Sequence, residues 1–234
     1  LRSARWRGDV AGYALRAALL RLDRVPQGEA AAPSPEAAPF ALPELPVSVN
    51  IGQIKADQII LGDAVLGTEI SGQFAASAAL SGGQGTIDLT LERTDDGPDG
   101  LIALQAGYAN TTGELRLSLT AEEAAGGIVA GLLDIPGAPA LGLRIEADDP
   151  LSDFRADLNL TSDGQERLTG FVVLKGENEA GTAFSADLSG DLAPLFLPDY
   201  AEFFGDAIAL QAEGRREASG RLDLSRLWLE TRAL

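Results

Sequence analysis

The stretch DFRADLNLTSDGQERLTGFVVLK (Asp153–Lys175) decides the fold class. Apolar and polar side chains alternate on both sides of a turn-rich segment. This is the pattern in which a β-strand shows one apolar and one polar face. The dipeptide Asp163-Gly164 is typical of a tight reversal between two strands. The stretch therefore predicts an antiparallel hairpin, and much of the remaining chain repeats the same alternation with different loops.

The apolar pattern also constrains the pairing of the two strands. A two-residue loop at Asp163-Gly164 would place Leu160 opposite Arg167, an apolar residue against a charged one. Because a slip of one residue turns every side chain to the other face, we predict a loop with an odd number of residues or a β-bulge. A three-residue loop, Asp163–Gln165, satisfies this condition. Its register gives the pairs Leu160–Leu168, Leu158–Gly170, Ala156–Val172 and Phe154–Leu174.

The charge of the chain limits its partners. The 234 residues include 35 acidic and 18 basic side chains, so the net charge is −17. Nucleic-acid phosphates and anionic lipid surfaces both require a basic protein surface. We therefore expect no nucleic-acid partner, and we interpret the acidic residues as a solvated polar face.

Several reactive residue types are missing altogether. The chain contains no Cys, no His and no Met. Disulfides, thiolate metal sites and His-based acid–base catalysis are therefore excluded. Asp95, Asp96 and Asp99 could bind Ca²⁺, but acidic loops with Gly and Pro are more typical of turns. We predict no enzymatic activity, no cofactor and no metal.

The ends of the chain suggest a larger protein. Position 1 is not Met, so we expect a fragment or a processed chain, with a signal peptide or membrane anchor lying outside it. No run of about 18 apolar residues occurs, so no helical membrane span is expected within the chain.

Three regions differ in composition. Residues 1–25 match strand and helix patterns equally well, and we predict a strand segment of the main sheet. Residues 26–46 carry six of the twelve prolines with Ala, Glu and Ser, a composition that predicts a disordered insertion. Its last part, Phe40–Pro43, could dock on the sheet. Residues 47–234 form the main β-region, with an irregularity expected near Gly52 and short helices at Glu122–Leu133 and Pro194–Phe204.

The alternation predicts an all-β, mostly antiparallel fold with one or two short helices. The helices are too few to cover one face of so many strands, so a sandwich, a closed barrel or a curled sheet must do so. Aromatic residues make up only 6% of the chain, and many apolar positions are Ala or Gly. A tightly filled core usually contains larger side chains, which favours a sheet whose apolar face is not fully covered.

The residues of the apolar alternation are candidates for lining such an open face. Each could equally be an ordinary core residue, because both roles require the same alternation. The candidates are Phe74, Leu89, Tyr108, Leu117, Leu143, Phe154, Leu158, Val172, Leu188 and Leu210.

Three longer phrases resemble the N-terminal half of the TamB family, the translocation and assembly module subunit, as found in α-proteobacteria. The resemblance covers nearly the whole chain and consists of structural phrases without catalytic motifs. The phrases are LPELPVSVNIGQIKADQIILGDAVLG (Leu42–Gly67), GGIVAGLLDIPGAPAL (Gly126–Leu141) with DPLSDFRADLNLTSDGQERLTGFVVLKG (Asp149–Gly176), and LAPLFLPDYAEFFGDAIALQAEGRREASGRLDLSRLWL (Leu192–Leu229).

This resemblance implies a long, mostly antiparallel curled sheet. The chain would be one segment of a periplasmic AsmA-like trough, anchored in the inner membrane by a part outside this chain. Such a trough would carry phospholipid acyl chains towards the outer membrane. Regions beyond this chain would bind an outer-membrane β-barrel partner of the Omp85 class. Two alternatives stay open: a scaffold that assembles outer-membrane proteins by strand addition, and a purely structural β-solenoid. Because a segment of a sheet exposes its edge strands, we also expect the chain to self-associate.

Overall fold

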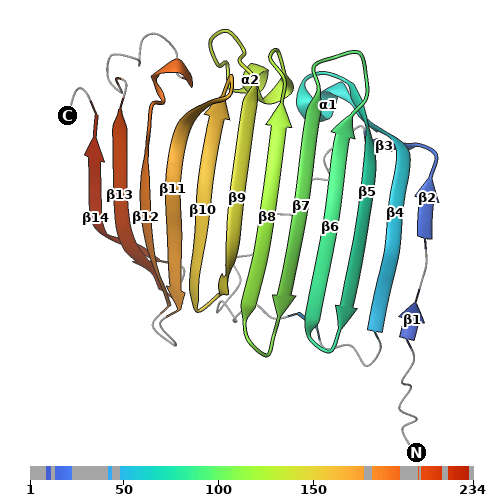
Figure 1. Cartoon of the computed structure of the whole chain (residues 1–234), viewed down its shortest axis with the longest axis horizontal. Helices are drawn as coiled ribbons and strands as arrows, with labels where there is room; N and C mark the ends of the chain where they lie inside the picture. Colours follow the sequence, from blue (N-terminus) through green and yellow to red (C-terminus); the bar gives the residue numbers. More distant parts are fainter. Residues whose placement is uncertain are drawn as a thin grey trace, which may run out of the picture.

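A computed structural model describes residues 9–11, 14–22, 42–43, 48–176, 181–195, 205, 207–217 and 221–231. Its strands form a single 14-stranded sheet (Figure 1). The strands are β1 (Asp9–Ala11), β2 (Ala14–Ala17), β3 (Leu20–Leu22), β4 (Ser48–Leu61), β5 (Ile70–Ser81), β6 (Gln84–Arg93), β7 (Gly100–Ala109), β8 (Glu114–Glu123), β9 (Leu141–Pro150), β10 (Asp153–Ser162), β11 (Gln165–Gly176), β12 (Thr182–Gly190), β13 (Ile208–Arg216) and β14 (Leu222–Glu230).

The order of the strands follows the sequence. From β4 to β14 each strand pairs antiparallel with the next strand along the chain. The three short strands β1, β2 and β3 differ, because all of them pair parallel with β4 along its free edge. Residues 1–25 fitted both strand and helix patterns. The regular elements described in this region are the three strands β1, β2 and β3.

The hairpins β4–β5 and β10–β11 both contain β-bulges. In β4 the pairing with β5 shifts between Ile51 and Ile54, as predicted near Gly52, and again between Ala56 and Ile59. In the hairpin of β10 and β11 every apolar pair predicted from the sequence is present. The predicted three-residue loop is wrong, however. The turn has two residues, Asp163 and Gly164, and the register shifts after Leu160, so the β-bulge alternative is confirmed.

The helices are short and lie at one end of the sheet (Figure 1). They are α1 (Asp63–Leu66), α2 (Ile128–Leu132) and a 3₁₀ turn at Ala193–Leu195. The helix predicted from Glu122 begins later, because Glu122 and Glu123 are the last residues of β8. Most of the helix predicted at 194–204 falls outside the described residues. No helix in the described parts is long and apolar enough to span a bilayer.

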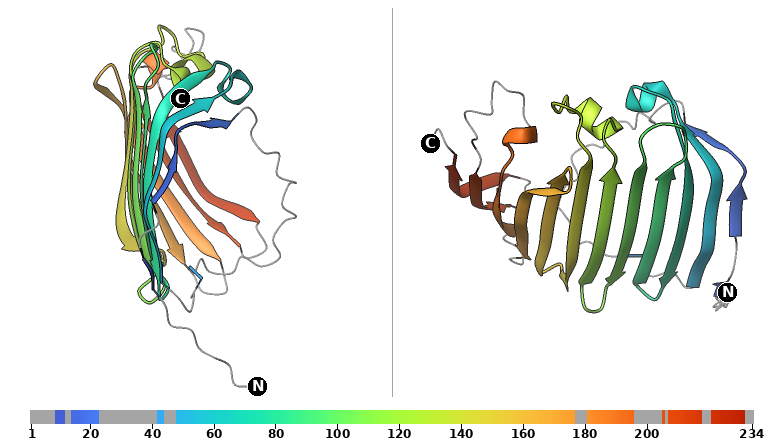
Figure 2. Two further views of the ribbon diagram at one scale, coloured as in Figure 1. Left: turned by 90° about the vertical axis from the view of Figure 1, so that its right-hand side faces the viewer. Right: turned by 45° about the horizontal axis from the view of Figure 1, so that its top comes forward.

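The sheet curls and stays open between its two edges. Figure 2 shows β11 to β14 swinging out of the plane of the central strands, towards the side on which the short segment 42–43 lies. Few apolar residues of the described chain are buried, and they are Ala56, Ala130, Phe154 and Ile208. The predicted fold class is therefore confirmed: an all-β, mostly antiparallel curled sheet with two short helices and very little closed core.

Candidate functional site: an apolar sheet face

One face of the sheet carries apolar side chains in rows that run across the strands. Cross-strand pairing defines two central rows, which we call row 1 and row 2. Row 1 consists of Ile54, Ala76, Leu89, Leu104, Leu119, Ile145, Leu158, Gly170, Leu188, Leu210 and Leu229. Each strand from β4 to β14 contributes one residue, so the row is about 50 Å long at the usual strand spacing.

Row 2 is the next row on the same face and contains smaller side chains. It lies two residues from row 1 on every strand except β4, where a bulge makes the separation three residues. It consists of Ile51, Ala78, Ile87, Ala106, Leu117, Ala147, Ala156, Val172, Ala186, Ala212 and Leu227. No polar side chain interrupts either row. Alanine recurs in row 2, and its small side chain leaves space between the larger residues on either side.

The row beyond row 2 contains three aromatic residues. Beyond row 2, Tyr108, Phe154 and Phe184 stand on the same face, at the positions two residues further along β7, β10 and β12. Row 1 and these aromatic residues are separated by four positions along a strand, about 13 Å. Row 2 therefore contains more small side chains than row 1, and it lies between row 1 and these three aromatic residues.

The structure places all of the candidate lining residues on this one face. Phe154 is buried, with 8% of its surface exposed. The other candidates are partly exposed, and their neighbours Ile87 and Ile102 are 38% and 41% exposed. No second layer of described residues covers these rows. The sequence alone could not distinguish an open face from a filled core, and the exposure now favours an open face.

The opposite face is polar. Arg116 pairs with Asp148 at 3.0 Å and Arg155 with Asp157 at 2.7 Å. The Arg155 guanidinium also lies 3.7 Å from the centre of the Phe171 ring. Exposed ion pairs contribute at most about 1 kcal/mol each, so their main effect is to keep this face hydrated. The sheet is therefore amphipathic as a whole.

Row 1 lacks a side chain at Gly170 for a backbone reason. The φ angle of Gly170 is +149°, and a Cβ atom at this position would lie 2.0 Å from the carbonyl oxygen of Asp187 on the neighbouring strand. Only glycine fits this close approach. The gap in the apolar row is thus a consequence of strand packing.

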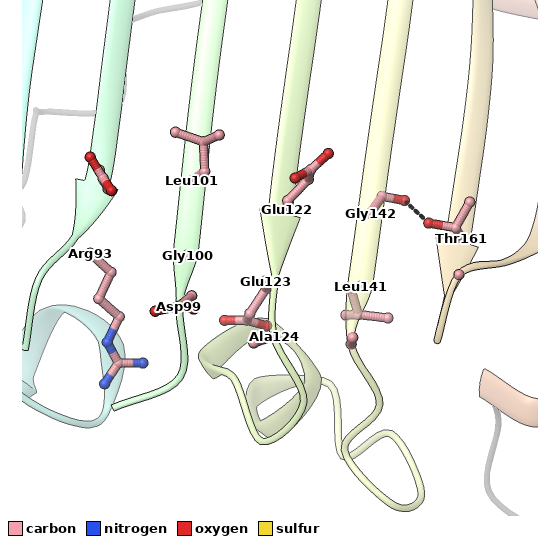
Figure 3. A pocket seen from close by; sticks show the side chains of 13 residues that line it. Arg93, Asp99, Gly100, Leu101, Glu122, Glu123, Ala124, Leu141, Gly142 and Thr161 are labelled. Carbon is pink, nitrogen blue, oxygen red and sulfur yellow. Dashed lines mark hydrogen bonds between the residues drawn. The ribbon is translucent and has the colours of Figure 1, made fainter. Parts of the chain in front are cut away.

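A hollow of about 550 Å³ lies at the end of β6–β10 near α2 (Figure 3). Its rim includes the acidic residues Glu92, Asp99, Glu122 and Glu123. The Glu123 carboxylate is already bound, because it accepts hydrogen bonds from the first N–H groups of α2. The described residues contain no group of three or more acidic side chains arranged to hold a metal ion.

Asp95, one of the acids that could have bound Ca²⁺, instead holds the loop after β6. Its carboxylate accepts hydrogen bonds from the Ser71 N–H at 2.9 Å, the Gly97 N–H at 2.8 Å and Arg93 Nε at 2.7 Å. Burial raises the pKa of Asp95, but these donors outweigh it and hold the pKa below its usual value. The turn interpretation of this loop accounts for the contacts of Asp95.

One hydrogen-bonded contact on the apolar face was not predicted from the sequence. The side-chain amide of Asn110 binds the main chain of Leu42, which lies in the segment expected to dock on the sheet. Leu42 does dock there, but Asn110 begins an Asn-Thr-Thr-Gly segment whose composition indicates only a turn. No pattern in the sequence pointed to Asn110 as the partner.

No protein-family model, curated protein or solved structure matches this chain, so the resemblance to the TamB family remains a prediction.

Proposed function

We propose that the apolar face binds the acyl chains of phospholipids, and that the chain is a periplasmic segment of a TamB-like lipid transporter acting between the inner and outer membranes. The observation that carries this proposal is the continuity of rows 1 and 2 from β4 to β14, with nearly all of their residues partly exposed. A soluble protein rarely leaves an apolar surface of this extent uncovered unless it binds something.

The energetics favour an acyl chain over a polar ligand. Each buried CH₂ group contributes about 0.8 kcal/mol, so the contact of a long chain with the apolar face gives several kcal/mol. The small alanines of row 2 leave space for the chain between larger apolar side chains. Transfer along such a surface requires neither a nucleophile nor a metal.

A photo-crosslinking amino acid tests this proposal. It is placed at Leu117, in row 2, or at Thr120, on the opposite face of the same strand, β8. The purified protein is incubated with vesicles of phosphatidylethanolamine and phosphatidylglycerol, irradiated, and its intact mass is measured. We expect lipid adducts at position 117 and few at position 120. Adding Leu158→Asp should reduce the adducts at position 117 about tenfold or more, because a buried carboxylate opposes an apolar ligand.

Equal labelling at positions 117 and 120, or no labelling at either, would overturn the proposal. In the full-length protein, Leu117→Asp and Leu158→Asp should both block lipid movement without unfolding the sheet. Circular dichroism provides the folding control, and Thr120→Asp provides a matched charge on the polar face.

The open edge strand β14 favours a second candidate, a scaffold that captures partner strands. In the described residues β14 pairs with β13 alone, and its side chains Leu222 and Leu227 are each 63% exposed. The same crosslinker at Leu222 distinguishes the two functions. A protein adduct there, without lipid adducts at Leu117, would favour the scaffold.

A further inference from the structure

The apolar face ends differently at its two margins. Beyond row 2, Tyr108 and Phe154 continue the apolar pattern, and Asp149 is the one charged residue in the described part of that row. At the opposite margin, next to α2, the same alternation continues into polar residues. We call these residues the polar margin, and they are Arg93 on β6, Glu123 on β8 and Ser162 on β10. An amphipathic ligand therefore meets apolar side chains at one end of the strands and polar side chains at the other.

The β-bulge of the β10–β11 hairpin brings a further cation to the polar margin. The pairing shifts between Leu160 and Thr161, which leaves Arg167 as the extra residue on β11. Arg167 Nε donates a hydrogen bond at 2.8 Å to the hydroxyl oxygen of Ser162. Ser162 pairs with Leu141 and follows Leu160 by two positions, so it stands on the apolar side of the sheet. The Arg167 guanidinium is therefore held at this margin, although its residue type breaks the apolar pattern of β11.

The Arg167 guanidinium has unused hydrogen-bond donors. Besides Nε, its Nη1 atom donates to Asp191 Oδ2 at 3.2 Å and its Nη2 atom donates to Gln165 Oε1 at 2.9 Å. A guanidinium carries five N–H groups, so one on Nη1 and one on Nη2 have no acceptor among the described residues. Only 12% of the side chain is exposed, and unbonded donors on a largely buried cation are costly unless water or a ligand accepts from them. Two such N–H groups on different nitrogens suit two oxygens of one phosphate group.

Asp191 supplies the opposite charge beside this cation. Its Oδ2 atom accepts from Arg167, and its Oδ1 atom accepts from the Ala193 N–H at 3.2 Å. A carboxylate has about four acceptor positions, and 33% of this side chain is exposed, so it retains room for an external cation. A phosphate that is linked to an ammonium group would match both members of the Arg167–Asp191 pair.

The charge of the surroundings favours a ligand without net charge. The whole chain carries a net charge of −17, and the acidic residues Asp163 and Glu123 lie in the turn next to the bulge and on the polar margin itself. An anionic headgroup such as phosphatidylglycerol would bring an uncompensated negative charge towards these carboxylates. The headgroup of phosphatidylethanolamine carries one phosphate and one ammonium, so it brings no net charge and matches the ion pair.

We propose that Arg167 and Asp191 bind the headgroup of a zwitterionic phospholipid, with Arg167 on the phosphate and Asp191 on the ammonium. The acyl chains then run along the strands from the polar margin towards Phe154. Leu160 and Phe154 are six positions apart on β10, about 20 Å of apolar surface at the usual rise of a strand. This inference rests on the proposed function, to which it adds the class of headgroup and the orientation of the lipid.

A comparison of two lipids tests the headgroup site. Short-chain phosphatidylethanolamine and phosphatidylglycerol with identical acyl chains are titrated into the protein, and each Kd is measured by calorimetry. The variants are Asp191→Asn, which keeps the shape of the side chain, and Arg167→Gln. Asp157→Asn is the matched control, because Asp157 is also paired with an arginine, Arg155, but on the polar face. Circular dichroism shows whether each variant is folded.

We expect the unaltered protein to bind phosphatidylethanolamine about fivefold or more tightly than phosphatidylglycerol, a factor within the value of one hydrogen bond to a charged group. Asp191→Asn should remove most of this preference, because the ammonium loses its partner. Arg167→Gln should weaken the binding of both lipids, since both contain the phosphate. Asp157→Asn should behave like the unaltered protein. Loss of structure alone would weaken both lipids equally, so the ratio of the two Kd values distinguishes a binding role of Asp191 from a structural one.

Equal affinity for the two lipids, an unchanged preference in Asp191→Asn or unchanged affinities in Arg167→Gln would each overturn the headgroup site alone. Tight binding of phosphoethanolamine without acyl chains would also overturn it, because the site would then serve a soluble ligand. A lipid with a photoreactive group at the end of its acyl chain tests the orientation: adducts should form near Phe154, and adducts near Leu160 would contradict it. If neither lipid binds the unaltered protein, the proposed function fails and the headgroup site fails with it.

Discussion

Gly170 shows how a single residue shapes the apolar face. With a φ angle of +149° and the Asp187 carbonyl directly above it, this position cannot hold a side chain without moving β11 away from β12. The same residue leaves row 1 open between Leu158 and Leu188, its cross-strand neighbours. Backbone packing and the side-chain pattern of the apolar face therefore both depend on one glycine.

Replacing Gly170 with alanine should destabilise the region around β11 and β12 by about 1–3 kcal/mol, because the new Cβ atom is strained and meets the Asp187 carbonyl. Native-state hydrogen exchange of the amides in these strands measures the loss. Gly52→Ala is the control: a Cβ atom at Gly52 has no neighbour within 4 Å, so its effect should stay within about 0.5 kcal/mol. Similar exchange in the two variants would contradict this explanation.

Alternation in the sequence was enough to place individual side chains on a face. It placed Leu89, Leu117 and Leu158 correctly because the period of a strand is two, whatever the length of the loops. Alternation could not predict why position 170 must be glycine. The cause is the Asp187 carbonyl group, which belongs to the next strand, β12, beyond a loop. The Asn110–Leu42 contact could not be predicted for the same reason, because the two residues are joined only through the topology.

At the scale of elements, α2 is held by the strand that precedes it. The Glu123 carboxylate, at the end of β8, accepts hydrogen bonds from the main-chain N–H groups of Ile128, Val129 and Ala130. A Cβ atom at Gly127 would lie 1.9 Å from the Glu123 carboxyl carbon, so glycine is required to admit the carboxylate. The negative charge also suits the N-terminus of a helix.

Replacing Glu123 with alanine should therefore loosen α2 by about 1 kcal/mol, the usual value of a helix N-terminal cap. Exchange of the amide hydrogens at positions 128–130 should accelerate about fivefold. Glu122→Ala serves as the matched control, since Glu122 precedes Glu123 in the same strand and points to the other face. Equal acceleration in both variants would mean that Glu123 does not hold the helix.

The elements also show where a sequence pattern is ambiguous. The hairpin Asp153–Lys175 allowed an odd loop or a bulge, and both produce the same apolar pairs. The bulge occurs because Asp163, with φ +48°, and Gly164, with φ +74°, adopt the left-handed conformations of a tight two-residue turn. Glu122 and Glu123 suggested a helix start, yet Glu123 acts on the helix from the strand before it. The short helix α1 was not predicted, because its few residues give no helical period.

At the scale of the whole molecule, the two edges of the sheet differ. The β4 edge is covered by the short strands β1–β3, whereas β14 forms a long edge at the other end of the described sheet. Composition and alternation predicted an all-β fold whose apolar face is not fully covered, because the chain has few helices and few large core residues, and the curled sheet was expected from the resemblance to the TamB family. They could not predict which edge is covered, since parallel pairing of β1–β3 with β4 leaves no local signal.

The uncovered edge leads us to expect that the 234-residue protein self-associates through β14. Sedimentation velocity over a range of concentrations should show dimers or larger species. The double variant Leu224→Lys and Leu227→Lys should raise the apparent Kd about tenfold or more, because charged side chains discourage edge-to-edge pairing. Ser118→Lys, in the middle of the sheet on its polar face, should leave association unchanged. A strictly monomeric protein at high concentration would refute the expectation.

The order of strands has a consequence for cooperativity. From β4 to β14 each strand contacts the strands that precede and follow it in the sequence, so the sheet is linked like a chain of neighbouring units. Stability in such a structure is approximately a sum of local terms and nearest-neighbour terms, as in repeat proteins. We expect unfolding to spread from either edge, with separate local opening free energies along the sheet and no single transition. A substitution in β11 should therefore leave amide protection in β5 almost unchanged.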